Sequence, residues 1–201
     1  MLQDRRGFLA ILAGAWATPA LSQTPSPAAR AQALSPEMSR PTAYAFSFKR
    51  LEGGNLRLAE HAGKPILIVN TASLCGYTPQ YEGLQQLWTR FRDKRLLVIG
   101  VPSNDFGGQE PRNPAEIGHT VHGKYGVTFP LAEKVTVTGA SAHPFFKWAA
   151  GERPLEVPRW NFHKYLVGRH GHITAAFSPD IEPSNARIVA AITKEMRPAA
   201  S

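Results

Sequence analysis

The sequence has 201 residues, a hydrophobic fraction of 43% and a formal charge of +8. Such a chain is long enough for one soluble domain with a substantial core. Its 23 lysines and arginines are scattered rather than clustered, so we expect no nucleic-acid partner despite the positive charge.

Residues 1–22 have the features of an export signal. Arg5 and Arg6 precede a short apolar run, and small residues follow as far as Ser22. The run is shorter than the ~20 residues of a transmembrane helix, so we expect no stable membrane anchor. The stretch Arg-Arg-Gly-Phe-Leu resembles a twin-arginine signal, which predicts cleavage and a periplasmic or otherwise extracytoplasmic location. Residues 23–42, rich in Pro, Ala and Ser, are expected to form a disordered linker.

The remaining residues, 43–201, are predicted to form one α/β domain. Short apolar runs typical of buried strands alternate with amphipathic segments typical of helices. Their order indicates a central mixed sheet flanked by helices and preceded by an N-terminal β-hairpin. In chain order we expect a hairpin at 43–60, a strand at 64–73, a helix at 78–92 and a strand at 95–103. A helix at 113–126 and an extended segment at 129–137 follow. The domain ends with a helix at 141–151 closed by Gly151, a hairpin at 163–177 and a helix at 183–196.

Cys75 is the single cysteine of the sequence, and it lies between the first central strand and the next helix. Thr78 is expected to cap that helix, with Pro79 in its first turn. Backbone N–H groups and the positive end of the helix favour a thiolate in such a loop. A lone cysteine can equally be a buried apolar residue. A reactive thiol and a structural module with an inert cysteine therefore both remain open.

Three neutral hydrogen-bond donors are predicted to lie near Cys75. Gln109 follows a Gly-Gly turn after the second central strand, and Trp160 and Asn161 precede the next strand. Because ligand sites of α/β proteins gather at the ends of sheet strands, we expect these segments to converge. Neutral donors can stabilise a thiolate and a developing alkoxide without a titrating base.

Five segments together resemble the glutathione peroxidase family. They are NTASLCGYTPQYEGL, PSNDFGGQEP, YGVTFPLAEK, AHPFFKW and WNFHKYLV, and the similarity extends over residues 43–183. The resemblance implies a thioredoxin-like fold and a catalytic set of Cys75, Gln109, Trp160 and Asn161. It also implies hydroperoxide substrates, a small thiol as co-substrate, glutathione by expectation, and no bound cofactor or metal. A long insertion of tetrameric members is absent before Trp160, which resembles the monomeric branch.

The sequence departs from the family at the second cysteine that many members carry. Val121 and Ser103 stand at two positions where cysteine is frequent, and Leu74 stands where a lysine is common. With one cysteine, no internal disulfide can form. The expected cycle therefore passes through a Cys75 sulfenic acid, which an external thiol converts to a mixed disulfide and a second thiol releases.

Other function classes fit the sequence less well. A non-catalytic redox sensor or binding protein would use Cys75 as a reversible switch, but it would not require the three donors. A dithiol oxidoreductase is excluded because Thr78 occupies the second position of a Cys-x-x-Cys motif. The histidine pairs at 119/122 and 170/172 lack further ligands at metal-binding spacing, so we expect them to be exposed side chains.

Overall fold

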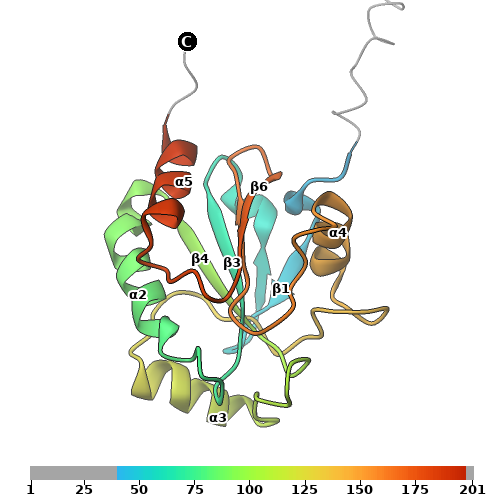
Figure 1. Ribbon diagram of the computed structural model, residues 1–201, viewed down its shortest axis with the longest axis vertical. Coiled ribbons are helices and arrows are strands. Elements are labelled where there is room, and N and C mark those ends of the chain that lie inside the picture. The colour runs from blue at the N-terminus through green and yellow to red at the C-terminus, as the bar shows by residue number, and fades with distance from the viewer. Residues whose placement is uncertain (1–39, 198–201) are drawn as a thin grey trace, which may run out of the picture. The chain divides into compact units, whose positions relative to one another are not determined.

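A four-stranded mixed sheet lies at the centre of the computed structural model, which describes residues 40–197 (Figure 1). The strand order is β4–β3–β5–β6. β3 (Ile66–Thr71) and β4 (Leu97–Pro102) are parallel. β5 (Lys164–Val167) pairs antiparallel with β3, and β6 (Ile173–Phe177) pairs antiparallel with β5. This arrangement confirms the expected mixed sheet. The predicted export signal and nearly all of the predicted linker lie outside the described residues.

Both central strands are buried along their whole length, as their continuous apolar sequences predict. In β3, Leu67 and Val69 contribute to one apolar core, whereas Ile66 and Ile68 contribute to a second. Successive side chains of a strand point to opposite faces of the sheet, so one short strand serves both cores. Both faces of the sheet must therefore be covered.

Different parts of the chain cover the two faces (Figure 1). α2 (Gln80–Phe91) and α5 (Ala186–Met196) pack on the first core. α4 (Pro144–Glu152) and the antiparallel hairpin of β1 (Ser47–Lys49) and β2 (Asn55–Arg57) pack on the second. The hairpin confirms the predicted one. No helix among residues 40–197 combines the length and apolar character that crossing a bilayer requires.

The helix expected at 113–126 is divided in two. α3 (Pro114–Gly118) starts where predicted, because the Asn113 side chain accepts a hydrogen bond from the Ala115 N–H at 2.9 Å. The chain then widens into the π-helical segment η5 (His119–Lys124). The wider turn still directs Val121 into the first core, where it is fully buried.

Several predicted segment ends are also wrong. The 43–60 hairpin is shorter because Ala43–Ala45 (η2) and Leu58–His61 (η3) form 3-10 turns. Gly151 lies inside α4 rather than closing it. The extended segment at 129–137 forms no regular strand in the described structure and reaches its neighbours through isolated bridges of Leu131 and Ala132 and single backbone hydrogen bonds.

Thr78 does not cap α2 as predicted. The helix begins at Gln80, with Pro79 in the capping position and no capping side chain. Thr78 Oγ1 instead accepts a hydrogen bond from the Cys75 N–H at 3.0 Å, and it lies within donating distance of the Ala72 and Cys75 carbonyls. The hydroxyl therefore closes the loop that carries Cys75 rather than the helix.

Arg95 follows the turn η4 (Arg92–Lys94) with a φ of 77°, in the left-handed region. This conformation costs a residue with a side chain roughly 1–2 kcal/mol more than glycine. We predict that Arg95→Gly raises the free energy of unfolding in urea by about 0.5–1 kcal/mol. Arg92→Gly is the matched control, because Arg92 has a φ of −56° and its replacement should lower stability by a similar amount. A destabilised Arg95→Gly protein would contradict the strain argument.

Candidate active site

Cys75 lies in the loop between β3 and α2, at the edge of the first core, with only 7% of the residue exposed. Its Sγ accepts a hydrogen bond from the Tyr77 N–H at 3.4 Å. This is the only hydrogen bond to the sulfur within residues 40–197. The loop thus presents a backbone donor to the sulfur, a contact that suits an anionic sulfur.

Gln109 and Asn161 are in direct contact. The Asn161 Nδ2 donates to Gln109 Oε1 at 3.0 Å and to the Phe106 carbonyl at 3.3 Å. Asn161 is fully buried. Asn161 occupies one of the two lone pairs of the Gln109 oxygen, and the N–H groups of the Gln109 amide can still donate to a third partner. The two neutral side chains are therefore fixed to each other, and their role as donors to Cys75 stays a prediction.

The Gln109 loop is joined to the Cys75 loop by two hydrogen bonds. The Leu74 N–H donates to the Gln109 carbonyl at 3.0 Å. One residue away on each side, Ser73 Oγ donates to Glu110 Oε1 at 2.7 Å. Cys75 and Gln109 therefore lie on adjoining backbone segments, although no hydrogen bond joins their side chains in the described structure.

Trp160 is held at the same edge by Asn70, near the end of β3. The Asn70 Nδ2 donates to the Trp160 carbonyl at 3.1 Å, and the Asn70 carbonyl accepts from the Phe162 N–H at 2.6 Å. The Trp160 ring is 40% exposed and lies 6.0 Å from the Phe106 ring, centroid to centroid. The four predicted site residues thus occupy three adjoining loops, with Trp160 at the solvent side.

Glu110 is a residue of this region that sequence reasoning missed. Only 3% of it is exposed, and burial raises its pKa to about 7 from the usual 4.5. Hydrogen bonds from Ser73 and the charge of Lys134 oppose this shift in pKa but do not overcome it. A charged residue directly after Gln109 was the available signal, but sequence alone could not show that it is buried.

Of the histidines expected to be exposed, His122 makes structural contacts. His122 places Nδ1 2.8 Å from the Val127 carbonyl and Nε2 2.9 Å from Glu52 Oε1. These contacts link η5 to the turn between β1 and β2. Among residues 40–197, no group of three or more His, Cys, Asp or Glu side chains is arranged to hold a metal ion.

Comparison with known proteins decides the family. The glutathione peroxidase family model matches residues 43–150. The chain belongs to the glutathione peroxidase family. The hydroperoxy fatty acid reductase gpx1 of Synechocystis sp. is 45% identical over 151 residues, which cover 71% of this chain and 89% of that protein. The glutathione peroxidase-like peroxiredoxin gpx1 of Schizosaccharomyces pombe is 37% identical over 145 residues, covering 71% and 92%.

Solved structures confirm the thioredoxin-like fold expected for this peroxidase family. The crystal structure of Trgpx in its apo form is similar with a TM-score of 0.61 and 32% identity, covering 77% of this chain and 97% of that one. T. cruzi GPX1 gives a TM-score of 0.62 at 26% identity, covering 78% and 97%. Family membership makes this chain a thiol-dependent peroxidase, and it does not favour the alternative of a non-catalytic redox sensor.

Glu110 should make the stability of this glutathione peroxidase homologue fall as pH rises. Between pH 4.5 and about 7 the folded protein holds a proton on Glu110 that the unfolded chain has released. The free energy of unfolding therefore decreases across this window and levels off above it. We predict that the free energy of unfolding of Glu110→Gln, measured relative to the wild type, rises by on the order of 3 kcal/mol between pH 4.5 and pH 8.

Urea unfolding of both proteins at the two pH values measures this difference. His163 contributes with the opposite sign, because burial lowers its pKa to about 4. It is present in both proteins and cancels in the comparison. A stability difference that does not change with pH would contradict the prediction.

Proposed function

We propose that Cys75 is the peroxidatic residue and that Gln109, Trp160 and Asn161 stabilise its reactive states. The Cys75 thiolate attacks one oxygen of a hydroperoxide, the O–O bond breaks, and the leaving oxygen takes a proton to become water or an alcohol. Sulfur is oxidised to sulfenic acid as the peroxide is reduced. The neutral donors stabilise charge on sulfur and on the leaving oxygen without titrating near neutral pH.

The Asn161–Gln109 hydrogen bond carries this proposal. It engages the Gln109 oxygen and leaves the Gln109 N–H groups able to donate, while the Leu74–Gln109 backbone bond holds the Gln109 loop beside the Cys75 loop. A donor prepared for a charge that forms only during the reaction fits catalysis better than a structural role.

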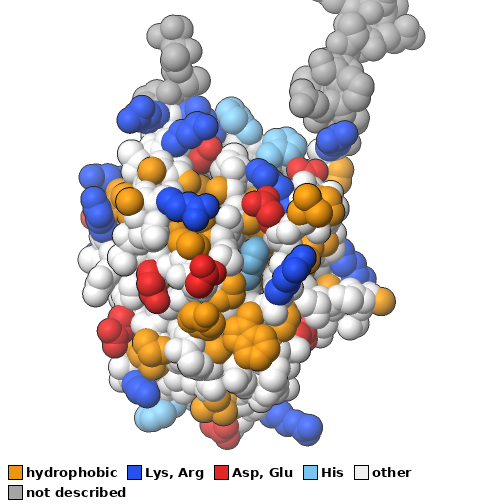
Figure 2. Space-filling view, in the orientation of Figure 1, with side chains coloured by type: hydrophobic (Ala, Val, Ile, Leu, Met, Phe, Trp, Pro, Cys, Tyr) orange, Lys and Arg blue, Asp and Glu red, His pale blue; other side chains and the backbone are white. Residues whose placement is uncertain are grey.

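The preferred substrates are hydrogen peroxide and organic hydroperoxides. Leu74, beside Cys75, is 69% exposed, and the Trp160 ring is also partly exposed. These two side chains give the site an apolar rim. On the face seen in Figure 2, apolar side chains are grouped in the lower half. The names of two Synechocystis relatives, both hydroperoxy fatty acid reductases, support an apolar hydroperoxide.

Replacing the donors should slow peroxide reduction. We predict that Gln109→Ala and Trp160→Phe each lower the second-order rate of Cys75 oxidation by about 10²-fold, because each removes a donor from the transition state. Cys75→Ser should abolish it. Stopped-flow measurement of peroxide consumption, with thermal unfolding as the test of folding, checks this. The matched controls are Gln86→Ala on the exposed side of α2 and Trp88→Phe. Wild-type rates in both donor variants would remove these residues from the site.

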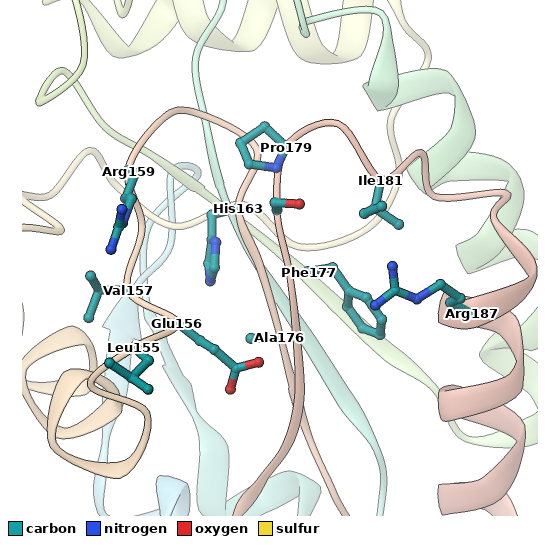
Figure 3. A pocket seen from close by; sticks show the side chains of 11 residues that line it. Leu155, Glu156, Val157, Arg159, His163, Ala176, Phe177, Pro179, Ile181 and Arg187 are labelled. Carbon is teal, nitrogen blue, oxygen red and sulfur yellow. The ribbon is translucent and has the colours of Figure 1, made fainter.

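The reductant is proposed to be glutathione, bound beside the Trp160–Asn161 loop. A pocket of about 310 Å³ adjoins this loop, at the lower end of the size range of ligand pockets. Figure 3 shows Arg159 and Arg187 on opposite sides of it, with Phe177 between them. Guanidinium groups on two sides suit a thiol with carboxylates at both ends. His163 lines the pocket as a neutral ring, since burial lowers its pKa to about 4.

Glutathione should therefore react directly with oxidised Cys75. We predict that, after one equivalent of peroxide, glutathione forms an adduct of about 305 Da and then releases the thiol, whereas thioredoxin acts weakly because no disulfide is presented. Mass spectrometry follows both reactions. Arg159→Ala with Arg187→Ala should slow adduct formation, and Arg90→Ala with Arg112→Ala is the control for net charge. Fast reduction by thioredoxin with no glutathione adduct would show the assignment to be wrong.

The remaining proposals concern location and assembly. We propose that the protein is exported as a folded monomer to the periplasm or another extracytoplasmic compartment. Arg5 and Arg6 support the twin-arginine route, and the short connection before Trp160 supports the monomer. We predict that replacing both arginines by lysine blocks export, as measured by cell fractionation. Undiminished export of the double variant would contradict this route, and a dimer mass in light scattering would contradict the monomer.

A further inference from the structure

Glu110 holds two catalytic loops together from inside the protein. Its carboxyl accepts a hydrogen bond from Ser73 Oγ at 2.7 Å, across 37 residues of sequence. Ser73 lies two residues before Cys75, and Glu110 lies one residue after Gln109. Together with the parallel Leu74–Gln109 backbone bond, this contact fixes the register between the sulfur and the Gln109 amide.

The loop around Glu110 is itself closed by further contacts. The Glu110 N–H donates to Asn104 Oδ1 at 2.9 Å, and Lys134 Nζ donates to the Pro111 carbonyl at 2.6 Å. The carboxyl therefore has little freedom to leave Ser73. Small displacements of reacting groups can cost about 10²-fold in rate, so a rigid link at this place matters for the reaction.

The surroundings of the second carboxyl oxygen favour the protonated form of Glu110. Within residues 40–197, Glu110 Oε2 is buried and has no hydrogen-bond partner. An ionised oxygen in such a place loses its hydration without compensation, whereas a protonated carboxyl loses much less. Burial accordingly raises the pKa of Glu110 to about 7, so the group changes its charge in the neutral range.

We propose that Glu110 is a positioning residue of the peroxidase reaction, whose carboxyl aligns the Cys75 loop with the Gln109 loop and whose proton keeps a second negative charge away from the Cys75 sulfur. The proposal rests on the proposed role of Cys75. Its first part concerns geometry and is expected at every pH. Its second part concerns charge, because an ionised Glu110 opposes a thiolate on the adjoining loop.

Two other ionisable groups interact with the charge of Glu110. Tyr81 of α2 stays neutral, because burial and the charge of Glu110 both raise its pKa. The charge of Lys134 attracts the ionised carboxyl. Cys75 lies on the adjoining β3–α2 loop, two residues after Ser73. Because Tyr81 stays neutral as pH rises through the neutral range, Glu110 is the group of this buried contact whose charge changes there.

Paired variants separate the two parts of the proposal. Glu110→Gln keeps an acceptor for Ser73 and cannot ionise, whereas Glu110→Ala and Ser73→Ala remove the link. Glu133→Gln, an exposed carboxyl, is the control. The rates of Cys75 oxidation by hydrogen peroxide and of alkylation by iodoacetamide are measured from pH 5.5 to 8.5, with thermal unfolding to verify folding.

We expect the peroxide rate of Glu110→Gln to equal that of the wild type near pH 5.5 and to exceed it by about threefold or more at pH 8.5. The rate of alkylation by iodoacetamide should differ between Glu110→Gln and the wild type by the same ratio. Glu110→Ala and Ser73→Ala should be slower with peroxide by about tenfold or more at every pH. Glu133→Gln should match the wild type throughout.

If the ratio of the Glu110→Gln peroxide rate to the wild-type peroxide rate does not change with pH, the charge part of the proposal is overturned. Wild-type peroxide rates in both folded Glu110→Ala and Ser73→Ala would overturn the positioning part. A wild-type Cys75 that alkylates but does not react with peroxide would overturn the proposed function itself, an outcome distinct from the other two.

Discussion

The central position of β3 determines where the reactive loop lies. β3 is paired on both edges and buried on both faces, so it cannot shift in any direction without disturbing a core or a strand ladder. Its parallel register with β4 pairs Thr71 with Pro102, and its antiparallel register with β5 pairs Val69 with Lys164. The loops after β3 and β4 and the segment before β5 therefore meet at one edge.

That edge is polar, and most of its buried hydrogen-bonding side chains are neutral. Asn70, Ser73 and Asn161 are buried there as neutral hydrogen-bonding groups. Burial shifts the ionisable groups there toward their neutral forms, since it raises the pKa of Glu110 to about 7 and lowers that of Lys164 to about 8. A hydrogen bond from a neutral donor is electrostatically stronger in such a region of low dielectric than in water. Such surroundings suit a reaction in which charge appears on sulfur and on a leaving oxygen.

The single thiol places a requirement on the rest of the surface. A chain with only Cys75 cannot store an oxidised state as an internal disulfide, so the sulfenic acid of the proposed cycle must stay accessible to a molecule from solution. Cys75 is nevertheless almost buried, with the exposed side chains of Leu74 and Trp160 near it. Apolar side chains are therefore exposed next to Cys75 in sequence and in the neighbouring Trp160 loop, whereas Arg159 and Arg187 line the pocket that adjoins the Trp160–Asn161 loop.

The sequence by itself determined the central strands and the family, and it predicted four site residues, because these depend on local patterns. Continuous apolar runs predicted β3 and β4, and the motifs around Cys75 and Gln109 carried the resemblance. Tertiary structure alone decided which polar groups meet. Ser73 reaches Glu110 across 37 residues, and Asn161 reaches Gln109 across 52. Thr78, a fitting helix cap in sequence, closes the Cys75 loop instead. Such pairings arise from strand register and burial, and no local pattern records them.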